Sequence, residues 1–248
     1  MQFLGGECLN KLFPVTLALI TFFSSSALAA PVCVTDTLAS YIGLGSTGCE
    51  VAGGTFSNFQ TLTPITGATA IPASGITITP VQSANMLGID VMFSVTAMTG
   101  ELRQALLGYM LTAPSITSNM VTVSGTSATG GGVVTDIQNY CAGGQFLPGD
   151  VTGCTGSTDD ALVVLNAGTQ QATFPGVSQI SVVHDFTLDA VGGGTATGGM
   201  VSDRFTVASN GPAPIPEPQT YVLMSSALLA IALRSRLQKR RELKEGQK

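Results

Sequence analysis

The chain has 248 residues, of which only 10% are charged, and it contains 30 Gly, five Cys and no Trp. Soluble domains are usually about 25% charged. Between Ala30 and Ile215, two basic residues, Arg103 and Arg204, stand against eleven acidic ones, which gives this region a net charge of −9. So acidic a region cannot neutralise a phosphate backbone, and we therefore expect no nucleic-acid partner.

Residues 1–29 have the features of a secretory signal peptide. Lys11 precedes an apolar run at 12–23, and Ala27, Ala29 and Ala30 then supply the small residues that signal peptidase requires. The run is too short for a permanent membrane anchor and ends in a cleavage pattern. We therefore expect export through the Sec machinery, with cleavage by signal peptidase after Ala29 or Ala30.

The C-terminus has three parts in order. Residues 211–219 are a Pro-rich linker, which favours an extended chain because each Pro fixes φ. Residues 220–233 predict a single transmembrane helix, and the basic residues of 234–248 follow it. Positive charges beyond an apolar helix stay cytoplasmic, so residues 30–210 are expected on the outer side. Fourteen residues make about 21 Å of helix against about 30 Å of hydrocarbon, which predicts a weak, temporary anchor.

This tail resembles a known sorting signal. Pro216-Glu217-Pro218, one apolar helix and a terminal basic cluster are similar to the PEP-CTERM signal, found in exported proteins of Gram-negative bacteria that make exopolysaccharide. The resemblance implies that an exosortase recognises Pro216, Glu217 and Pro218, and that the helix retains the chain until it is cut. It also implies that a basic cluster acts as the membrane stop, namely Arg234, Arg236, Lys239, Arg240 and Arg241.

Four cysteines remain once the leader has been removed. They are Cys33, Cys49, Cys141 and Cys154. An even number of Cys in an exported chain indicates disulfides, for which three pairings are possible. We favour Cys33–Cys49 and Cys141–Cys154, because each pair brackets a Gly-rich loop. A metal site would need closer spacing and usually His, so we expect neither a metal nor another cofactor.

The region 30–210 reads as one secreted all-β domain. Between Leu87 and Val95 apolar residues occupy every second position, which is typical of a strand with one buried face. Similar segments, separated by turns, predict an antiparallel β-sandwich of jelly-roll or Ig-like type; they are 75–80, 105–111, 115–124, 132–140, 161–166, 179–190 and 195–207. One short helix is expected at Asp36–Ile42, capped by Thr35 or Asp36. The signal helix and the transmembrane helix flank this domain.

Parts of the domain also resemble a group of PEP-CTERM proteins. The similar segments include Thr37–Ile42, Thr55–Phe59 and Ser178–Leu188. This resemblance implies a secreted β-sandwich of unassigned activity.

Two groups of residues are candidates for chemistry. His184, the only His, alternates with Val182 and Phe186 and therefore lies on the apolar face of its strand, whereas Asp185 points the other way. This pattern favours a packed His over a catalytic one. Asp150, Asp159 and Asp160 lie in a Gly- and Thr-rich stretch, where they form either a solvated turn or a calcium-binding loop.

These features favour a non-enzymatic surface or matrix protein. The expected route leads transiently through the inner membrane to the cell surface or extracellular matrix, with extracellular polysaccharide as a candidate partner. An alternative is a secreted carbohydrate-binding module, although such modules usually expose aromatic side chains and this chain has no Trp and only four Tyr. A hydrolase is a third hypothesis, which would require several carboxylates to converge in a cleft.

Overall fold

A computed structural model describes residues 30–146 and 153–208. The predicted signal peptide, the Pro-rich linker with its Pro-Glu-Pro motif, the predicted transmembrane helix and the basic tail lie outside the described residues. Within the described ranges, no helix has the length and apolar character that crossing a membrane requires. The elements, in chain order, are β1 (Asp36–Thr37), α1 (Leu38–Gly43), β2 (Cys49–Val51), β3 (Gly54–Leu62), β4 (Thr69–Ala70), the 3-10 turn η1 (Ala73–Gly75), β5 (Ile76–Ser83), β6 (Met86–Phe93), β7 (Thr96–Ala97), β8 (Leu102–Ser124), β9 (Ser127–Thr129), β10 (Val133–Ala142), β11 (Thr158–Leu165), β12 (Gly168–Asp189), β13 (Thr195–Thr197) and β14 (Met200–Val207).

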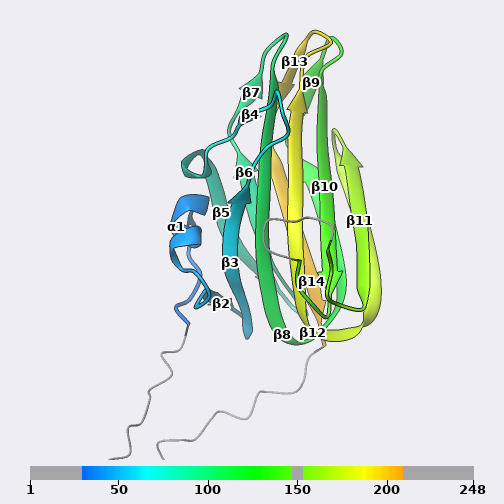
Figure 1. Cartoon of the computed structure of the whole chain (residues 1–248). Coiled ribbons are helices and arrows are strands. Elements are labelled where there is room, and N and C mark those ends of the chain that lie inside the picture. Colours follow the sequence, from blue (N-terminus) through cyan, green and yellow to red (C-terminus); the bar gives the residue numbers. More distant parts are fainter. Residues whose placement is uncertain (1–29, 147–152, 209–248) are drawn as a thin grey trace, which may run out of the picture.

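The strands form two layers, which confirms an all-β, mainly antiparallel sandwich (Figure 1). We call the layer with strand order β2–β3–β8–β12–β10–β11 sheet I. The layer with order β1–β5–β6–β14–β8–β12 is sheet II. Strands β8 and β12 are long enough to belong to both layers.

The two shared strands change layers where their ladder is interrupted. The first half of β8 pairs with the second half of β12 in sheet I, and the remaining halves pair in sheet II. Between these stretches the register shifts at Thr173, Val177 and Gln179. Pro114 and Pro175 lie at this interruption, where a residue without a backbone N–H leaves no ladder bond unmade. The predicted strands 105–111 and 115–124 are therefore one 23-residue strand, which corrects the expectation of two.

Other boundaries also differ from the expectation. The expected strand 195–207 is divided at Gly198-Gly199 into β13 and β14. Helix α1 begins at Leu38 and is capped by Thr37, whose hydroxyl accepts a hydrogen bond from the amide of Ser40 at 3.2 Å. Strand β3 was absent from the prediction, because its residues alternate poorly between apolar and polar.

The interior between the sheets is filled by every second residue of the strands. Ile89 and Val91 on β6 and Leu107 and Leu111 on β8 are almost fully buried, as their alternation predicts. At one end of the sandwich, β7, β13 and β9 form a separate three-stranded sheet (Figure 1). There Gly194 has a φ of +79°, and a Cβ would stand 1.8 Å from the carbonyl oxygen of Thr129, so the turn requires glycine.

Two disulfides join the predicted cysteine pairs. Cys33 bonds to Cys49 and Cys141 bonds to Cys154. Cys141 and Val183 lie on the outer face of sheet I, where Phe146 packs on them and forms a second, smaller apolar cluster. The disulfides suggest an oxidising, extracytoplasmic location, because such bonds rarely persist in a reducing cytosol.

Removing the Cys33–Cys49 bond tests its share of the stability. We expect the double variant Cys33→Ala/Cys49→Ala to lose about 3 kcal/mol of unfolding free energy, the value typical of a loop of about 15 residues. Urea unfolding of the oxidised protein and of the variant measures the difference. An unchanged midpoint would show that the loop is held by other contacts.

Candidate functional site

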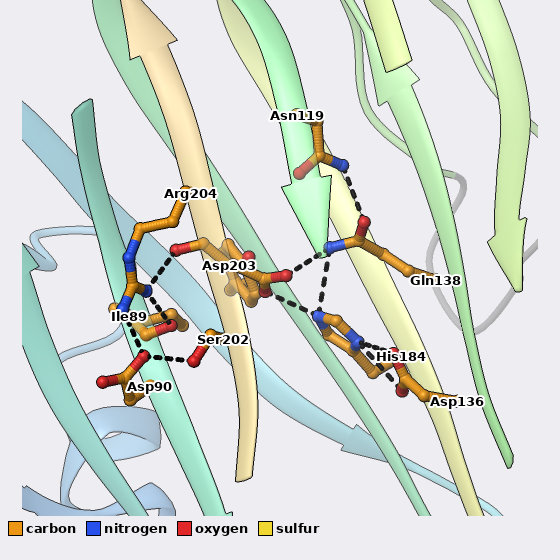
Figure 2. Close-up of polar contacts among 10 residues, drawn as sticks. Ile89, Asp90, Asn119, Asp136, Gln138, His184, Ser202, Asp203 and Arg204 are labelled. Carbon is orange, nitrogen blue, oxygen red and sulfur yellow. Dashed lines mark hydrogen bonds and ion pairs between the residues drawn. The ribbon is translucent and has the colours of Figure 1, made fainter. Parts of the chain in front are cut away.

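Inside the sandwich, His184 lies between two carboxylates. Its Nδ1 is 3.2 Å from both carboxylate oxygens of Asp136 on β10, and its Nε2 is 2.7 Å from Oδ2 of Asp203 on β14. The side chains of Asp136 and Asp203 are fully buried, and that of His184 is 1% exposed. Figure 2 shows the imidazole between the two acids. Because His184 and Asp136 belong to sheet I and Asp203 to sheet II, the three residues connect the layers.

Tyr109 provides a further contact across the layers. Its hydroxyl donates to Oδ2 of Asp203 at 2.5 Å. The Tyr109 ring stacks on Phe59, with ring centroids 5.5 Å apart, and meets Phe205 edge-on at 6.4 Å. The aromatic contacts hold the ring in place, so its hydroxyl is directed at the carboxylate.

Two buried amides complete the network, and their orientation follows from Asp203. A carboxylate only accepts, so Nε2 of Gln138 donates to Oδ1 of Asp203 at 2.6 Å. Oε1 of Gln138 therefore faces Asn119 and accepts from its Nδ2 at 2.8 Å. Among the described residues, Oδ1 of Asn119 is the one buried side-chain nitrogen or oxygen atom without a hydrogen-bond partner. We call Tyr109, Asn119, Asp136, Gln138, His184 and Asp203 the interior network.

The charges of this network determine the protonation of His184. Burial alone lowers the pKa of His184, but the carboxylates of Asp203 and Asp136 outweigh it and raise the pKa to about 10. Burial also raises the pKa of Asp136, an effect that His184 partly opposes. With both ring nitrogens protonated, His184 donates to both acids, and its 3.3 Å contact with Nε2 of Gln138 joins two donors and is not a hydrogen bond.

A second polar group lies beside the network on the outer face of sheet II. Arg204 follows Asp203 on β14, and its Nη2 donates to Oδ1 of Asp90 at 2.7 Å. Ser202 donates to the same oxygen, also at 2.7 Å (Figure 2). Nη1 of Arg204 donates to the backbone carbonyl of Asp203 at 2.9 Å. This ion pair is less than one quarter exposed and fixes a cation on the far side of the strand from His184.

The interior network is closed to substrates. The side chains of Asp136, His184 and Asp203 are at most 1% exposed. A surface hollow of about 270 Å³ lies elsewhere, at the end of the sandwich near Ala52 and Pro114. Within the described residues, no three or more His, Cys, Asp or Glu side chains are arranged to hold a metal ion. The network can therefore hold charge and connect the sheets, but it offers no reacting atom to a ligand.

The other residues singled out from the sequence lie away from this network or outside the described residues. Asp185 faces away from His184, as predicted, and accepts from Nε2 of Gln104 at 2.7 Å. Asp159 and Asp160 are exposed neighbours on β11 and so point to opposite faces of the strand. Asp150, the cleavage residues Ala27 and Ala29, the motif 216–218 and the membrane-stop cluster lie outside the described residues, and Ala30 is the first residue described.

The sequence prediction missed the partners of His184, although a signal was present. Asp136 alternates with Val134, and Asp203 alternates with Val201 and Phe205, so each acid occupies an inward position of its strand. A carboxylate at an apolar position indicates a buried partner. Which residue that partner is depends on strand pairings between segments far apart in the chain.

Comparisons with known proteins assign no family. No family model and no curated protein matches the chain. A solved structure with some similarity is the enzymatically active domain of tailspike protein 4 from bacteriophage CBA120, at 11% identity and a TM-score of 0.23. The match covers 62% of this chain and 19% of the tailspike chain, so this chain spans about a fifth of that protein. At this level the similarity supports no conclusion about fold or activity.

Removing the imidazole tests the energetic role of the network. We expect His184→Gln to lose about 3–5 kcal/mol of unfolding free energy at pH 7, because two buried carboxylates would lose their cation. Chemical unfolding measures the change. The matched control is Asp159→Asn, which removes an exposed carboxylate from β11 and is expected to change stability by less than about 0.5 kcal/mol. Similar losses in both variants would contradict a special role for the interior network.

The raised pKa of His184 also predicts how stability depends on pH. The protonated form is stabilised in the folded state, so this contribution is complete below the ordinary pKa of 6.5 and is lost as pH rises towards about 10. We expect the unfolding free energy to fall by up to about 1.4 kcal/mol per pH unit across this window. Since His184 is the only His in the chain, His184→Gln should remove this slope. Equal slopes in the two proteins would contradict the assignment.

Proposed function

We propose that the protein is an exported cell-surface or extracellular-matrix component, sorted through a PEP-CTERM signal by an exosortase, whose β-sandwich serves a structural role. The observation that carries the proposal is the pair of disulfides, Cys33–Cys49 and Cys141–Cys154. They suit a body that folds outside the cytoplasm, as the signal pattern of residues 1–29 predicts. The three-part tail adds the sorting route.

The distribution of polar groups in the body supports a structural role. Its charged trio of Asp136, His184 and Asp203 is in the interior, where it connects the two sheets. Both basic residues of the body are paired at its surface, Arg103 with Glu101 and Arg204 with Asp90. A hydrolase would need comparable carboxylates at an accessible cleft.

Extracellular polysaccharide remains the proposed environment of the protein, but recognition by ring stacking has little support. Every Tyr and Phe within the described residues is buried, including Tyr41, Tyr109 and Tyr140 at 2% exposure each. Carbohydrate-binding surfaces that stack sugars on aromatic rings need such rings at the surface. We therefore favour the structural role over the alternative of a carbohydrate-binding module.

The intact mass of the exported protein tests the sorting route. In a host with the exosortase, we expect a mature C-terminus near Pro216–Pro218, whereas a strain without the enzyme should yield a chain ending at Lys248. The triple variant Pro216→Ala/Glu217→Ala/Pro218→Ala should also keep Lys248. The matched control Pro212→Ala/Pro214→Ala removes prolines just upstream and should be processed like the parent. A C-terminus at Lys248 with and without the exosortase would refute the proposal.

A further inference from the structure

A surface hollow of about 270 Å³ lies at the end of the sandwich opposite the small three-stranded sheet (Figure 1). We call it the end hollow. Three segments surround it, namely the β2–β3 turn at Ala52-Gly53, the β5–β6 turn at Ala84-Asn85 and the stretch of β8 at Ala113-Pro114. Strand β3 belongs to sheet I and β6 to sheet II, so the end hollow lies between the two layers. Its wall includes Leu87, which is 1% exposed, so it borders the apolar interior.

The wall of the end hollow is uncharged. Its polar side chains are those of Gln82 and Asn85, which are both exposed, and the remaining residues are Gly, Ala, Pro, Leu, Met and Val. An amide side chain can donate to a backbone carbonyl, whereas an apolar wall favours small apolar side chains. The chemistry of this hollow therefore suits an uncharged, extended peptide segment.

The chain leaves the described body at this hollow, whose wall includes Val207 and Ala208. The amide of Ala208 donates to the carbonyl oxygen of Ser115 at 2.8 Å. Since β14 runs antiparallel to β8, a chain that continues in this direction passes Pro114 and then Ala113. The direction in which β14 ends therefore leads across the end hollow.

The residues that follow match this wall. No residue from Ser209 to Ile215 is charged, and residues 212–215 are Pro-Ala-Pro-Ile. Pro favours the extended polyproline II form, whose carbonyls make no internal hydrogen bonds and are free to accept from side-chain amides. Pro212 is four residues beyond Ala208, which corresponds to a reach of at most about 14 Å. This stretch therefore begins within reach of the hollow.

We propose that residues 212–215 dock in the end hollow of their own chain, with the Pro and Ile side chains against its apolar wall. The tether to Ala208 keeps this segment at a high effective concentration beside the hollow, which favours it over a separate molecule. Pro also limits the conformational freedom that the segment loses on docking. The docked segment covers the gap between the two layers at this end of the sandwich.

Charge determines where docking ends. Beyond Ala52 and Gln82 lies a second hollow of about 310 Å³, whose wall includes the exposed Glu50. Like charges repel, so Glu217 is kept out of this second hollow. Docking therefore stops at Ile215 and holds the motif 216–218 next to the body. This consequence for sorting rests on the proposed function, whereas docking itself does not.

Disulfide trapping in the exported full-length chain tests the docked position. We expect Ala84→Cys/Ala213→Cys to form an intramolecular disulfide, identified by mass in a non-reduced digest. The matched control is Ser115→Cys/Ala213→Cys, because Ser115 also adjoins Ala208 but is not part of the wall of the end hollow. Docking should make the first bond form at least about tenfold faster than the second, since the tether alone favours both equally.

A fluorescent ring provides a second measurement. The chain has no Trp, so Ile215→Trp introduces a single indole. Ala84 has a φ of +41°, a conformation that Asp and Asn tolerate, so Ala84→Asp adds a charge to the wall and Ala84→Asn is its uncharged control. We expect Ala84→Asp to increase acrylamide quenching of the indole at least about twofold, because a charge disfavours apolar contact, and Ala84→Asn to leave it unchanged. Both variants carry the same tail, so burial of the indole by detergent is common to them.

Equal quenching in the Asp and Asn variants would overturn the proposal, provided that circular dichroism shows both to be folded. Trapping at Ala84 that is no faster than at Ser115 would also overturn it, and a disulfide between two chains would identify a second copy as the occupant instead. The C-terminus of each sample is read by mass. Docking and sorting can therefore fail separately.

Discussion

Burying an ionised group away from water costs several kcal/mol unless a partner compensates it, and this sandwich holds three such groups in contact. Asp136 and Asp203 flank His184, and each accepts one of the hydrogen bonds that an imidazolium can donate. Tyr109 and Gln138 add hydrogen bonds to Asp203, but His184 is the one cation of the interior network, so both acids depend on it. Because the members come from both sheets, the trio also constrains how the sheets dock. A slip of β14 by one residue would turn Asp203 towards solvent and bring Arg204 inside, leaving His184 with one acid.

The constraint is transmitted through the strands that belong to both layers. Tyr109 and Asn119 are on different halves of β8, so one strand supplies network residues to sheet I and to sheet II. The change of layer occurs at an irregular stretch near Pro114 and Pro175, where the ladder is already interrupted. Polar contacts between the layers and continuous backbone across them thus define one arrangement of the sandwich.

The few charged residues of the body have different partners on the inner and outer faces of the sheets. Arg204 on the outer face of β14 and Asp203 on its inner face are neighbours in sequence, yet one pairs with Asp90 and the other with His184. Five of the remaining acids in the described ranges are exposed, namely Asp36, Glu50, Asp159, Asp160 and Asp189.

By itself, the sequence determined the local features of this protein. Alternation of apolar residues predicted the core strands and the inward position of His184, since side chains of a strand alternate between two faces. Short spacing around Gly-rich loops predicted both disulfides, because the partners are close along the chain. The proposed export signal of residues 1–29 and the proposed sorting signal at 211–248 are likewise linear patterns, which can be read without the fold.

Only the tertiary structure decided which residues contact the side chain of His184. A period of two specifies the face of a strand but not the strand that packs against it, and Asp136 and Asp203 lie 48 and 19 residues from His184 in the chain. The same limit explains why 105–111 and 115–124 were expected as two strands: a Pro usually ends a strand, but Pro114 falls where the partner ladder has already shifted. Partnership in a sheet depends on contacts between distant segments, and these contacts exist only once the chain has folded.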